Sequence, residues 1–212
     1  STWVFPEKFP AQKARNPISD EFFDSPEVLT DVSSLVRESI QNSIDARVDL
    51  EEPVKAVIRI GVLNSSEAAT YFKGLQEHLE AVFDEGSTPT ATGICRYLAI
   101  EDFNTTGLTG NTNLDTAPIG QEENSSYTYF VHVEGQSNKG EGKKGKWGVG
   151  KIVFQKLSEL KTFFIFSQRR NEDSPDGVSK LWLGQSILKF HSLNGLTYQP
   201  DGWFAKQDPR GI

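Results

Sequence analysis

The segment from Arg37 to Ala46 constrains the chain most, because its pattern indicates a helix with two chemically different sides. At 100° per residue, Glu38, Asn42 and Asp45 fall within an arc of about 60°. The opposite side is apolar, and we expect it to face the core: Val32, Leu35, Val36, Ile40 and Ile44. Two carboxylates and an amide in one line suit a hard cation, and a carboxylate beside a metal-bound phosphate can act as a general base towards water. A plain surface helix is the alternative that this segment alone leaves open.

Helical and strand-like patterns alternate along the rest of the chain. Ser25 and Pro26 suit a helix start, with serine as the cap and proline at the first helical position, and this helix is expected to end near Asp49. Alternating apolar residues predict a half-buried strand, and aromatic and β-branched content predicts a buried one. The expected ranges are a strand at 54–63, a helix at 71–85, a short strand at 97–100, a helix at 148–160, a strand at 162–166, and a hairpin from 180–190 and 196–204.

This order of elements predicts an α/β fold, a two-layer sandwich in which helices cover one face of a mixed, mostly antiparallel sheet. Residues 1–25 are rich in proline and aromatic residues, and we expect an arm that packs on the body of this chain or of a partner. Residues 26–212 then form one domain. The polar, glycine-rich segment at about 109–146 is more typical of a functional lid than of a simple connection.

Composition narrows the setting in which the protein works. The 212 residues carry a formal net charge of −7, so we do not expect this domain alone to bind nucleic acid. No apolar run approaches the length of about 18 residues that a membrane span needs. A single cysteine, Cys95, excludes an internal disulfide framework and fits a reducing compartment, so the expected location is cytoplasmic. His78, His132 and His191 have no metal-ligand spacing and are expected to be structural or solvent-facing.

Two later segments also carry chemistry. After the strand expected at 97–100, Asp102 leads into a polar turn that runs to Gly110. Further on, the segment from Gly145 to Lys151 places glycines directly before a helix. Glycines let the backbone approach an anion closely, and the helix start behind them offers free N–H groups and a positive dipole end. This segment matches neither the P-loop pattern nor the Rossmann pattern.

Together and in this order, the three segments resemble the motifs of the GHKL ATPase superfamily, whose members share the Bergerat fold. Residues 38–46 match the pattern E-x-x-x-N-x-x-D-A, and residues 145–150 match G-x-[FW]-G-x-G. Asp102 stands where the family places its adenine-reading aspartate, at the end of a strand. The resemblance covers residues 26 to 170, roughly, and is closer to the heat-shock chaperone, MutL and MORC-like branch than to histidine kinases, which usually lack a glutamate base at the position of Glu38.

The resemblance implies a role for each matched residue. Glu38 would orient and deprotonate the attacking water, Asn42 would hold Mg²⁺, and Asp45 would support the site from one turn further on. Asp102 would accept a hydrogen bond from the adenine amino group, and Gly107 would belong to the turn that follows. In the glycine segment, backbone N–H groups would face the phosphates and one lysine could reach the γ-phosphate: Lys146, Trp147, Gly148, Val149, Gly150 and Lys151.

The chain departs from the family pattern in two places. The second motif is usually D-x-G-x-G, but here it runs Asp102-Phe103-Asn104-Thr105-Thr106-Gly107, so the glycine after the aspartate is absent and the turn is longer. The family also closes its site with a late strand that carries a Gly-Thr pair, and no such pair follows Gly150. We therefore expect the domain at 26–212 to lack its last strand or strands.

The function implied is Mg²⁺-dependent binding and hydrolysis of ATP by a module that acts as a nucleotide-driven conformational switch in a larger protein. The expected partners are ATP and ADP, a C-terminal effector domain, and a second copy in a nucleotide-dependent homodimer. Two alternatives stay open. One is a protein kinase domain like that of histidine kinases, and the other is an ATP-sensing or scaffold domain without turnover.

Overall fold

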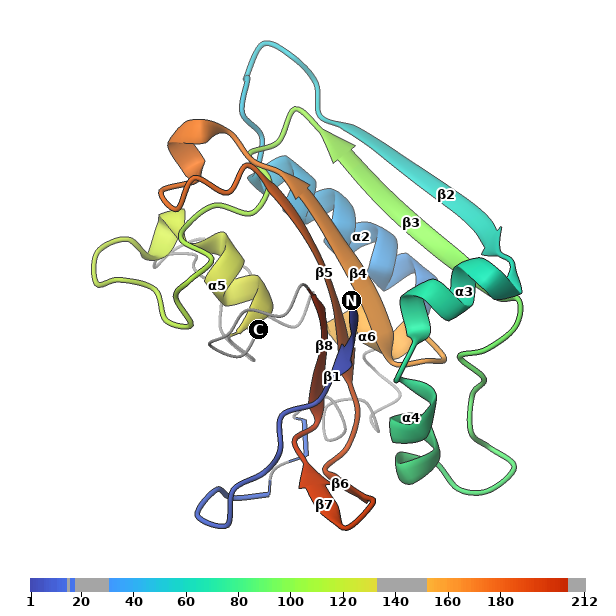
Figure 1. Ribbon diagram of the computed structural model, residues 1–212. Coiled ribbons are helices and arrows are strands. Elements are labelled where there is room, and N and C mark those ends of the chain that lie inside the picture. The colour runs from blue at the N-terminus through green and yellow to red at the C-terminus, as the bar shows by residue number, and fades with distance from the viewer. Residues whose placement is uncertain (15, 18–30, 133–151, 206–212) are drawn as a thin grey trace.

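A computed structural model describes residues 1–14, 16–17, 31–132 and 152–205 (Figure 1). Its largest sheet has four antiparallel strands in the order β1-β8-β5-β4. Their bounds are Thr2–Val4 for β1, Thr162–Gln168 for β4, Lys180–Ile187 for β5 and Asp201–Ala205 for β8. Two further pairs are also antiparallel: β2 (Lys55–Leu63) with β3 (Cys95–Phe103), and β6 (His191–Leu193) with β7 (Leu196–Tyr198).

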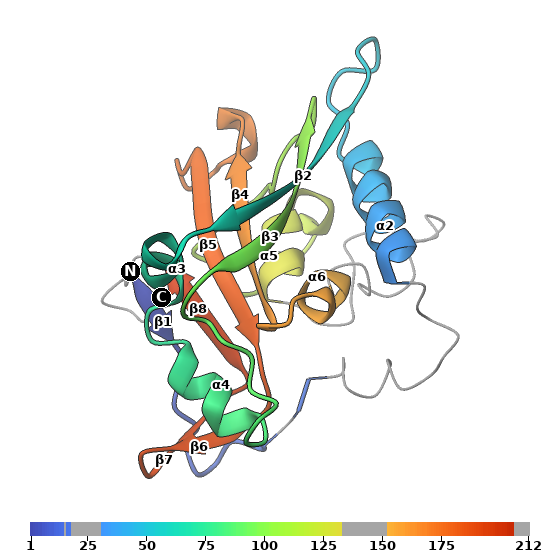
Figure 2. The same ribbon diagram turned by 90° about the vertical axis from the view of Figure 1, so that its right-hand side faces the viewer.

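One face of the four-stranded sheet is covered by α5 (Ser126–Val131), with α6 (Ile152–Leu157) beside it (Figure 2). The apolar cluster on this face joins the two layers: Tyr127 and Val131 from α5, Ile165 from β4, and Leu181 and Leu183 from β5. The long helix α2 (Asp31–Asp45) packs against α6 and β3. Two short 3-10 helices, η1 (Glu122–Asn124) and η3 (Asn171–Asp173), lie in the connections.

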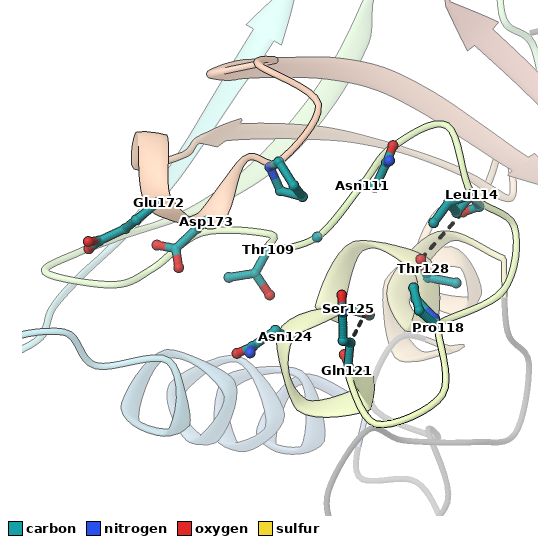
Figure 3. A pocket seen from close by; sticks show the side chains of 12 residues that line it. Thr109, Asn111, Leu114, Pro118, Gln121, Asn124, Ser125, Thr128, Glu172 and Asp173 are labelled. Atoms are coloured by element: carbon teal, nitrogen blue, oxygen red, sulfur yellow. Dashed lines mark hydrogen bonds between the residues drawn. The ribbon is translucent and has the colours of Figure 1, made fainter.

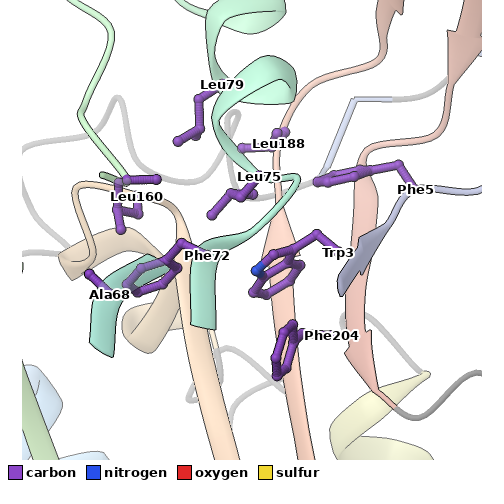
Figure 4. Close-up of a cluster of buried hydrophobic side chains, with 10 residues drawn as sticks. Trp3, Phe5, Ala68, Phe72, Leu75, Leu79, Leu160, Leu188 and Phe204 are labelled. Atoms are coloured by element: carbon purple, nitrogen blue, oxygen red, sulfur yellow. The ribbon is translucent and has the colours of Figure 1, made fainter. Parts of the chain in front are cut away.

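The other face of the same sheet is covered by α3 (Ser65–Phe72) and α4 (Gln76–Val82). Because side chains alternate along a strand, Phe164 of β4 points away from Ile165 and packs against this second cluster. The cluster gathers side chains from α3, from α4 and the residue before it, from the N-terminal strand and from β8, including Phe72, Leu75, Trp3 and Phe204 (Figure 4). These two packed faces confirm an α/β fold with mostly antiparallel strands, roughly consistent with a sandwich, although helices cover both faces of the sheet and not one as the sequence predicts.

The predicted strands at 54–63 and 162–166 are confirmed as β2 and β4, but the helix expected at 71–85 is divided. Gly74 separates α3 from α4 with a φ of 84°, and a Cβ there would lie 2.9 Å from Thr2 Oγ1. The N-terminal strand occupies this break, because Trp3 N donates to Lys73 O at 3.1 Å and Trp3 Nε1 donates to Tyr71 O at 2.8 Å. A long-range contact therefore interrupts a pattern that is locally helical.

The first residues of the chain pack on the chain's own body. Trp3 and Phe5 are each 4% exposed, and β1 pairs with β8 at the edge of the sheet. Backbone hydrogen bonds from Lys8 N to Thr197 O and from Gln199 N to Pro6 O continue this contact along β7. Within the described residues, no helix has the length and apolar character needed to cross a membrane.

Two histidines meet in the core between the N-terminal strand, α4 and β6. His78 Nδ1 lies 2.8 Å from His191 Nε2, and the ring of Phe5 stacks on His78 with centroids 4.1 Å apart. His191 Nδ1 lies 2.7 Å from Lys189 O, so the neutral ring of His191 carries its hydrogen on Nδ1 and accepts one from His78 at Nε2. Both rings are therefore held in their neutral form by the packing around them.

We expect the free energy of unfolding to fall as the pH drops below 6.5, the ordinary pKa of histidine, towards about 4. Burial, and then the neighbouring His191, lower the pKa of His78 to about 4, so the unfolded chain binds more protons than the folded protein in this window. The stabilisation is complete above pH 6.5, and its loss is at most about 3 kcal/mol.

Denaturant unfolding at a series of pH values measures this dependence. His78→Gln should flatten the profile between pH 6.5 and about 4. A His78→Gln profile as steep as that of the parent protein would contradict the assignment.

Candidate functional site

The long helix α2 turns a different side to the core than its apolar pattern predicts. Leu35, Ser39 and Ser43 are 3%, 7% and 3% exposed, whereas Ile40 and Ile44 are 43% and 54% exposed. The expectation that both isoleucines face the core is therefore wrong, as it is for Val32, which is also exposed. The Ser39 hydroxyl donates to Leu35 O at 2.7 Å, and the Ser43 hydroxyl has Ser39 O within reach at 2.9 Å, so the helix can bury both without an unsatisfied hydroxyl hydrogen.

The three polar residues of α2 lie on a flank beside this buried row. Glu38 is half-buried, with 36% of its side chain exposed, and it pairs with Arg37 at 3.5 Å on the surface. Asn42 and Asp45 are exposed, and Asp45 Oδ1 accepts a hydrogen bond of 2.8 Å from Gln41. Glu38 and Asn42 are therefore open to a ligand that approaches along this flank.

Asp102, near the end of β3, lies directly against α2. Its Oδ2 atom accepts a hydrogen bond of 2.8 Å from the Ser43 hydroxyl, and its Oδ1 atom accepts one of 3.0 Å from Thr105. Two of the three sequence segments singled out for chemistry are thus in contact, although they are far apart along the chain. Two hydroxyls fix the plane of the carboxylate, and a lone pair on each oxygen remains for a further donor.

Ser43 is a site residue that the sequence pattern did not indicate. It follows Asn42 directly and occupies a position where a helix of this kind would bury an apolar side chain. Its single hydrogen has two acceptors in reach, Ser39 O and Asp102 Oδ2, and the carboxylate is the stronger acceptor when it is ionised. A small hydroxyl on the buried row, four residues after Ser39, is the signal that could have found it.

The turn after Asp102 keeps a left-handed backbone without the glycine of the family pattern. Asn104 has a φ of 62°, a conformation that asparagine tolerates better than most residues with a side chain. Its amide nitrogen donates to Asp49 O at 3.1 Å and to Glu52 O at 2.8 Å, and its amide oxygen accepts from Asp49 N at 3.1 Å. Asparagine therefore supplies both the backbone geometry and a bridge to the loop after α2.

Gly107 lies where this turn crosses the end of β4. Its φ is 68°, and a Cβ would approach Ser167 Oγ to 2.5 Å and Gln168 O to 2.8 Å. The next residue, Leu108, donates its backbone N–H to Ser167 Oγ at 2.8 Å. Only glycine fits this close crossing, so a steric requirement explains glycine at position 107.

The glycine segment itself lies outside the described residues, and with it Lys146, Trp147, Gly148, Val149, Gly150 and Lys151. The helix that follows it, α6, packs against both α2 and β4. Phe154 of α6 lies 6.2 Å from Phe163 of β4 between ring centroids. The described start of α6 thus lies in the same layer as the helix that carries Glu38 and Asn42.

A resident metal centre has no support in the described part of the chain. Across residues 1–14, 16–17, 31–132 and 152–205, no three residues of the types His, Cys, Asp and Glu gather as metal ligands. Mg²⁺ that arrives with a nucleotide needs fewer protein ligands, because phosphates and water supply most of its coordination. Asn42 on the open flank of α2 fits that lesser role.

A cavity of about 390 Å³ lies where the loop after Gly107 meets α5 and η3 (Figure 3). Hydroxyl and amide groups line it, among them Thr109, Asn124, Ser125 and Thr128, and Asp173 faces it from η3. No lysine or arginine is among the described residues on its wall. The cavity therefore lacks the positive charge that phosphate groups need, and neither Asp102 nor α2 contributes to its lining.

Comparisons of the chain with protein-family models, with curated proteins and with solved structures find no match. The function of this chain is therefore inferred from its own residues and their geometry.

Replacing Asn104 should separate its two contributions to the turn. Asn104→Gly keeps the left-handed backbone available but removes the hydrogen bonds to Asp49 and Glu52, whereas Asn104→Ala removes those bonds and adds a conformational penalty of about 1 kcal/mol. We expect stability to fall in the order parent, glycine variant, alanine variant, as measured by denaturant unfolding. An alanine variant as stable as the glycine variant would show that the left-handed conformation does not matter.

Proposed function

We propose that the chain binds Mg²⁺–ATP and hydrolyses the γ-phosphate, as a GHKL-type ATPase module. The observation that carries the proposal is the contact between Asp102 and Ser43, because it joins the strand end that would read adenine to the helix that would hold the metal. The order of the three motifs along the chain adds to this contact, and so does the packing of α6 beside α2.

In this proposal Asp102 recognises the adenine base. A carboxylate can accept a hydrogen bond from the exocyclic amino group of adenine, whereas the corresponding carbonyl of guanine would meet it as a second acceptor. With Ser43 and Thr105 holding its two oxygens, the carboxylate needs little reorganisation when the base arrives. A negatively charged carboxylate also suits the adenine end of the nucleotide, because at the other end it would repel the phosphates.

In this proposal Glu38 and Asn42 carry out the hydrolysis. Asn42 would hold Mg²⁺ through its amide oxygen, and the metal would supply positive charge to the phosphate groups. Glu38 lies one helical turn earlier on the same flank, where its carboxylate can accept a proton from water. Asp45 would support this flank from the next turn, and the glycine segment at 145–151, which lies outside the described residues, would offer backbone N–H groups and a lysine to the phosphates.

The module would act as a switch if the lid expected at about 109–146 orders over bound nucleotide. When a segment becomes ordered or disordered with the presence of the γ-phosphate, the surface that it offers to partners changes. In this proposal a C-terminal effector domain and a nucleotide-dependent second copy of the chain are the partners that receive the signal.

Glu38→Gln should keep ATP binding and lose most of the hydrolysis. The base acts on water and not on the nucleotide, so we expect the dissociation constant of ATP to stay within about threefold of the parent value, while turnover falls by about a hundredfold or more. Calorimetry with Mg²⁺–ATP and a phosphate-release assay measure the two quantities. Glu77→Gln, at an exposed position on α4, is the matched control. Unchanged hydrolysis in Glu38→Gln would remove Glu38 from this role.

Ser43→Ala should weaken ATP binding and reduce the preference for ATP over GTP. Losing one hydrogen bond to the carboxylate costs about 1 kcal/mol, or roughly fivefold in affinity. Ser39→Ala is a close control, because it removes the same type of buried hydroxyl from the same helix, while the Ser39 hydroxyl donates to Leu35 O. Equal ATP affinity in the two variants would argue against orientation of Asp102 by Ser43.

A further inference from the structure

Arg169, the residue after β4, is buried, and its guanidinium group holds several parts of the chain together. The residue is 2% exposed, and Nη1 lies 3.3 Å from Asp176 Oδ1 in an ion pair whose two side chains are fully buried. Nη1 also donates to Val178 O at 3.0 Å. Nη2 donates to Asp173 O at 3.0 Å and to Gly110 O. One side chain thus satisfies three backbone carbonyls and a carboxylate.

Asp176 completes the same cluster from the turn between β4 and β5. Its Oδ2 atom accepts hydrogen bonds from Thr112 N at 2.6 Å and from Thr112 Oγ1 at 2.7 Å, and its Oδ1 atom accepts one from Val178 N at 3.0 Å. Burial on its own would raise the pKa of Asp176, but the hydrogen bonds from Thr112 and Val178 and the charge of Arg169 hold it below its ordinary value. The carboxylate therefore stays charged where it meets Thr112.

These contacts fasten the segment that begins at Asp102. Beyond the carboxylate, Thr106 N donates to Ala46 O at 2.9 Å and Leu108 N donates to Ser167 Oγ at 2.8 Å. Gly110 N then donates to Asp173 O at 3.0 Å. Gly110 O accepts a hydrogen bond from Arg169 Nη2, and Thr112 N donates one to Asp176 Oδ2. The segment 102–112 is therefore held at short intervals from α2 at one end to the buried pair at the other.

A buried ion pair is a poor way to stabilise a fold for its own sake. The cost of desolvating both charges often exceeds their attraction, and a well-packed apolar pair can replace such groups without loss. Here the pair does what apolar side chains cannot do, because it fixes the direction of backbone groups in a loop that has few apolar residues between Phe103 and Leu114. This points to a positional role for the pair.

We propose that Arg169 and Asp176 are positioning residues that hold the 102–112 segment so that Asp102 faces the adenine base. This inference rests on the proposed function and adds to it a source of nucleotide selectivity remote from the base. Neither side chain touches the nucleotide in this account. Their effect passes through Thr112, Gly110 and the bond from Leu108 to Ser167.

Asp176→Asn and Thr112→Val test the proposal, because each weakens the anchor and leaves Asp102, Ser43 and Thr105 intact. Thr112→Ser, which keeps the hydroxyl, is the conservative counterpart of the valine variant. Glu172→Gln is the control in the same turn, since the Glu172 carboxylate pairs with Arg170 at 2.6 Å and leaves the anchor intact. The probes are ATP and GTP with Mg²⁺, measured by calorimetry well below the melting temperature of each variant.

We expect Asp176→Asn to raise the dissociation constant of ATP about tenfold and to reduce the ratio of GTP to ATP dissociation constants by a similar factor. Thr112→Val should shift both quantities in the same direction by about threefold, and Thr112→Ser and Glu172→Gln should match the parent protein. Where Asp176→Asn does not fold, the threonine pair decides by itself. A lowered melting temperature with unchanged affinity and selectivity would overturn the proposal, because the pair would then be purely structural.

Amide hydrogen exchange in the absence of nucleotide tests the positioning of the 102–112 segment independently of whether the protein binds ATP. If the parent protein binds no ATP, the ATPase assignment fails, and exchange decides whether the anchor positions the segment. Faster exchange at Leu108 and Thr106 in Asp176→Asn than in Glu172→Gln supports the anchor. Faster exchange confined to Thr112 and Val178 overturns it.

Discussion

The hydroxyl of Ser43 and the carboxylate of Asp102 are 59 residues apart in sequence and meet at 2.8 Å. This contact sets which side of α2 faces β3, because a serine can lie against the strand end where an isoleucine would bring no donor. Around the helix, Asn42 lies about 100° and Glu38 about 140° from Ser43. The proposed nucleotide site depends on this one hydrogen bond more than on any apolar contact.

Backbone conformation after Asp102 provides the second constraint. Two left-handed residues, Asn104 and Gly107, turn the chain from β3 back across α2 and the end of β4. The asparagine adds hydrogen bonds to the loop after α2, and the glycine permits the approach to Ser167. The turn has one more residue between Asn104 and Gly107 than the D-x-G-x-G pattern has between its two glycines. The Asp102 carboxylate nevertheless reaches α2.

Much of the fold could be predicted from the sequence, and the remainder depends on contacts between distant residues. Alternation along 54–63 and aromatic content at 162–166 are local signals, and both strands are confirmed. The division of the helix at Gly74 depends on Thr2 and Trp3, which no local pattern can indicate. The buried side of α2 was predicted wrongly because its buried row includes two serines, Ser39, whose hydroxyl donates to Leu35 O, and Ser43, whose hydroxyl donates to Asp102. Asp102 was indicated by its position after a strand, whereas its pairing with Ser43 depends on a contact between residues 59 positions apart.

The central claim is that a magnesium–ATP complex lies between the polar flank of α2 and the glycine segment before α6. Paramagnetic relaxation with Mn²⁺–ATP in place of Mg²⁺–ATP tests it most directly, because Mn²⁺ broadens the amide signals of nearby residues only. The account predicts loss of the signals of Asn42 and of Gly148 to Gly150 together, with unchanged signals for α4 on the other face of the sheet. Broadening that spares Asn42, or that is strongest around the cavity at Asn124, would contradict it.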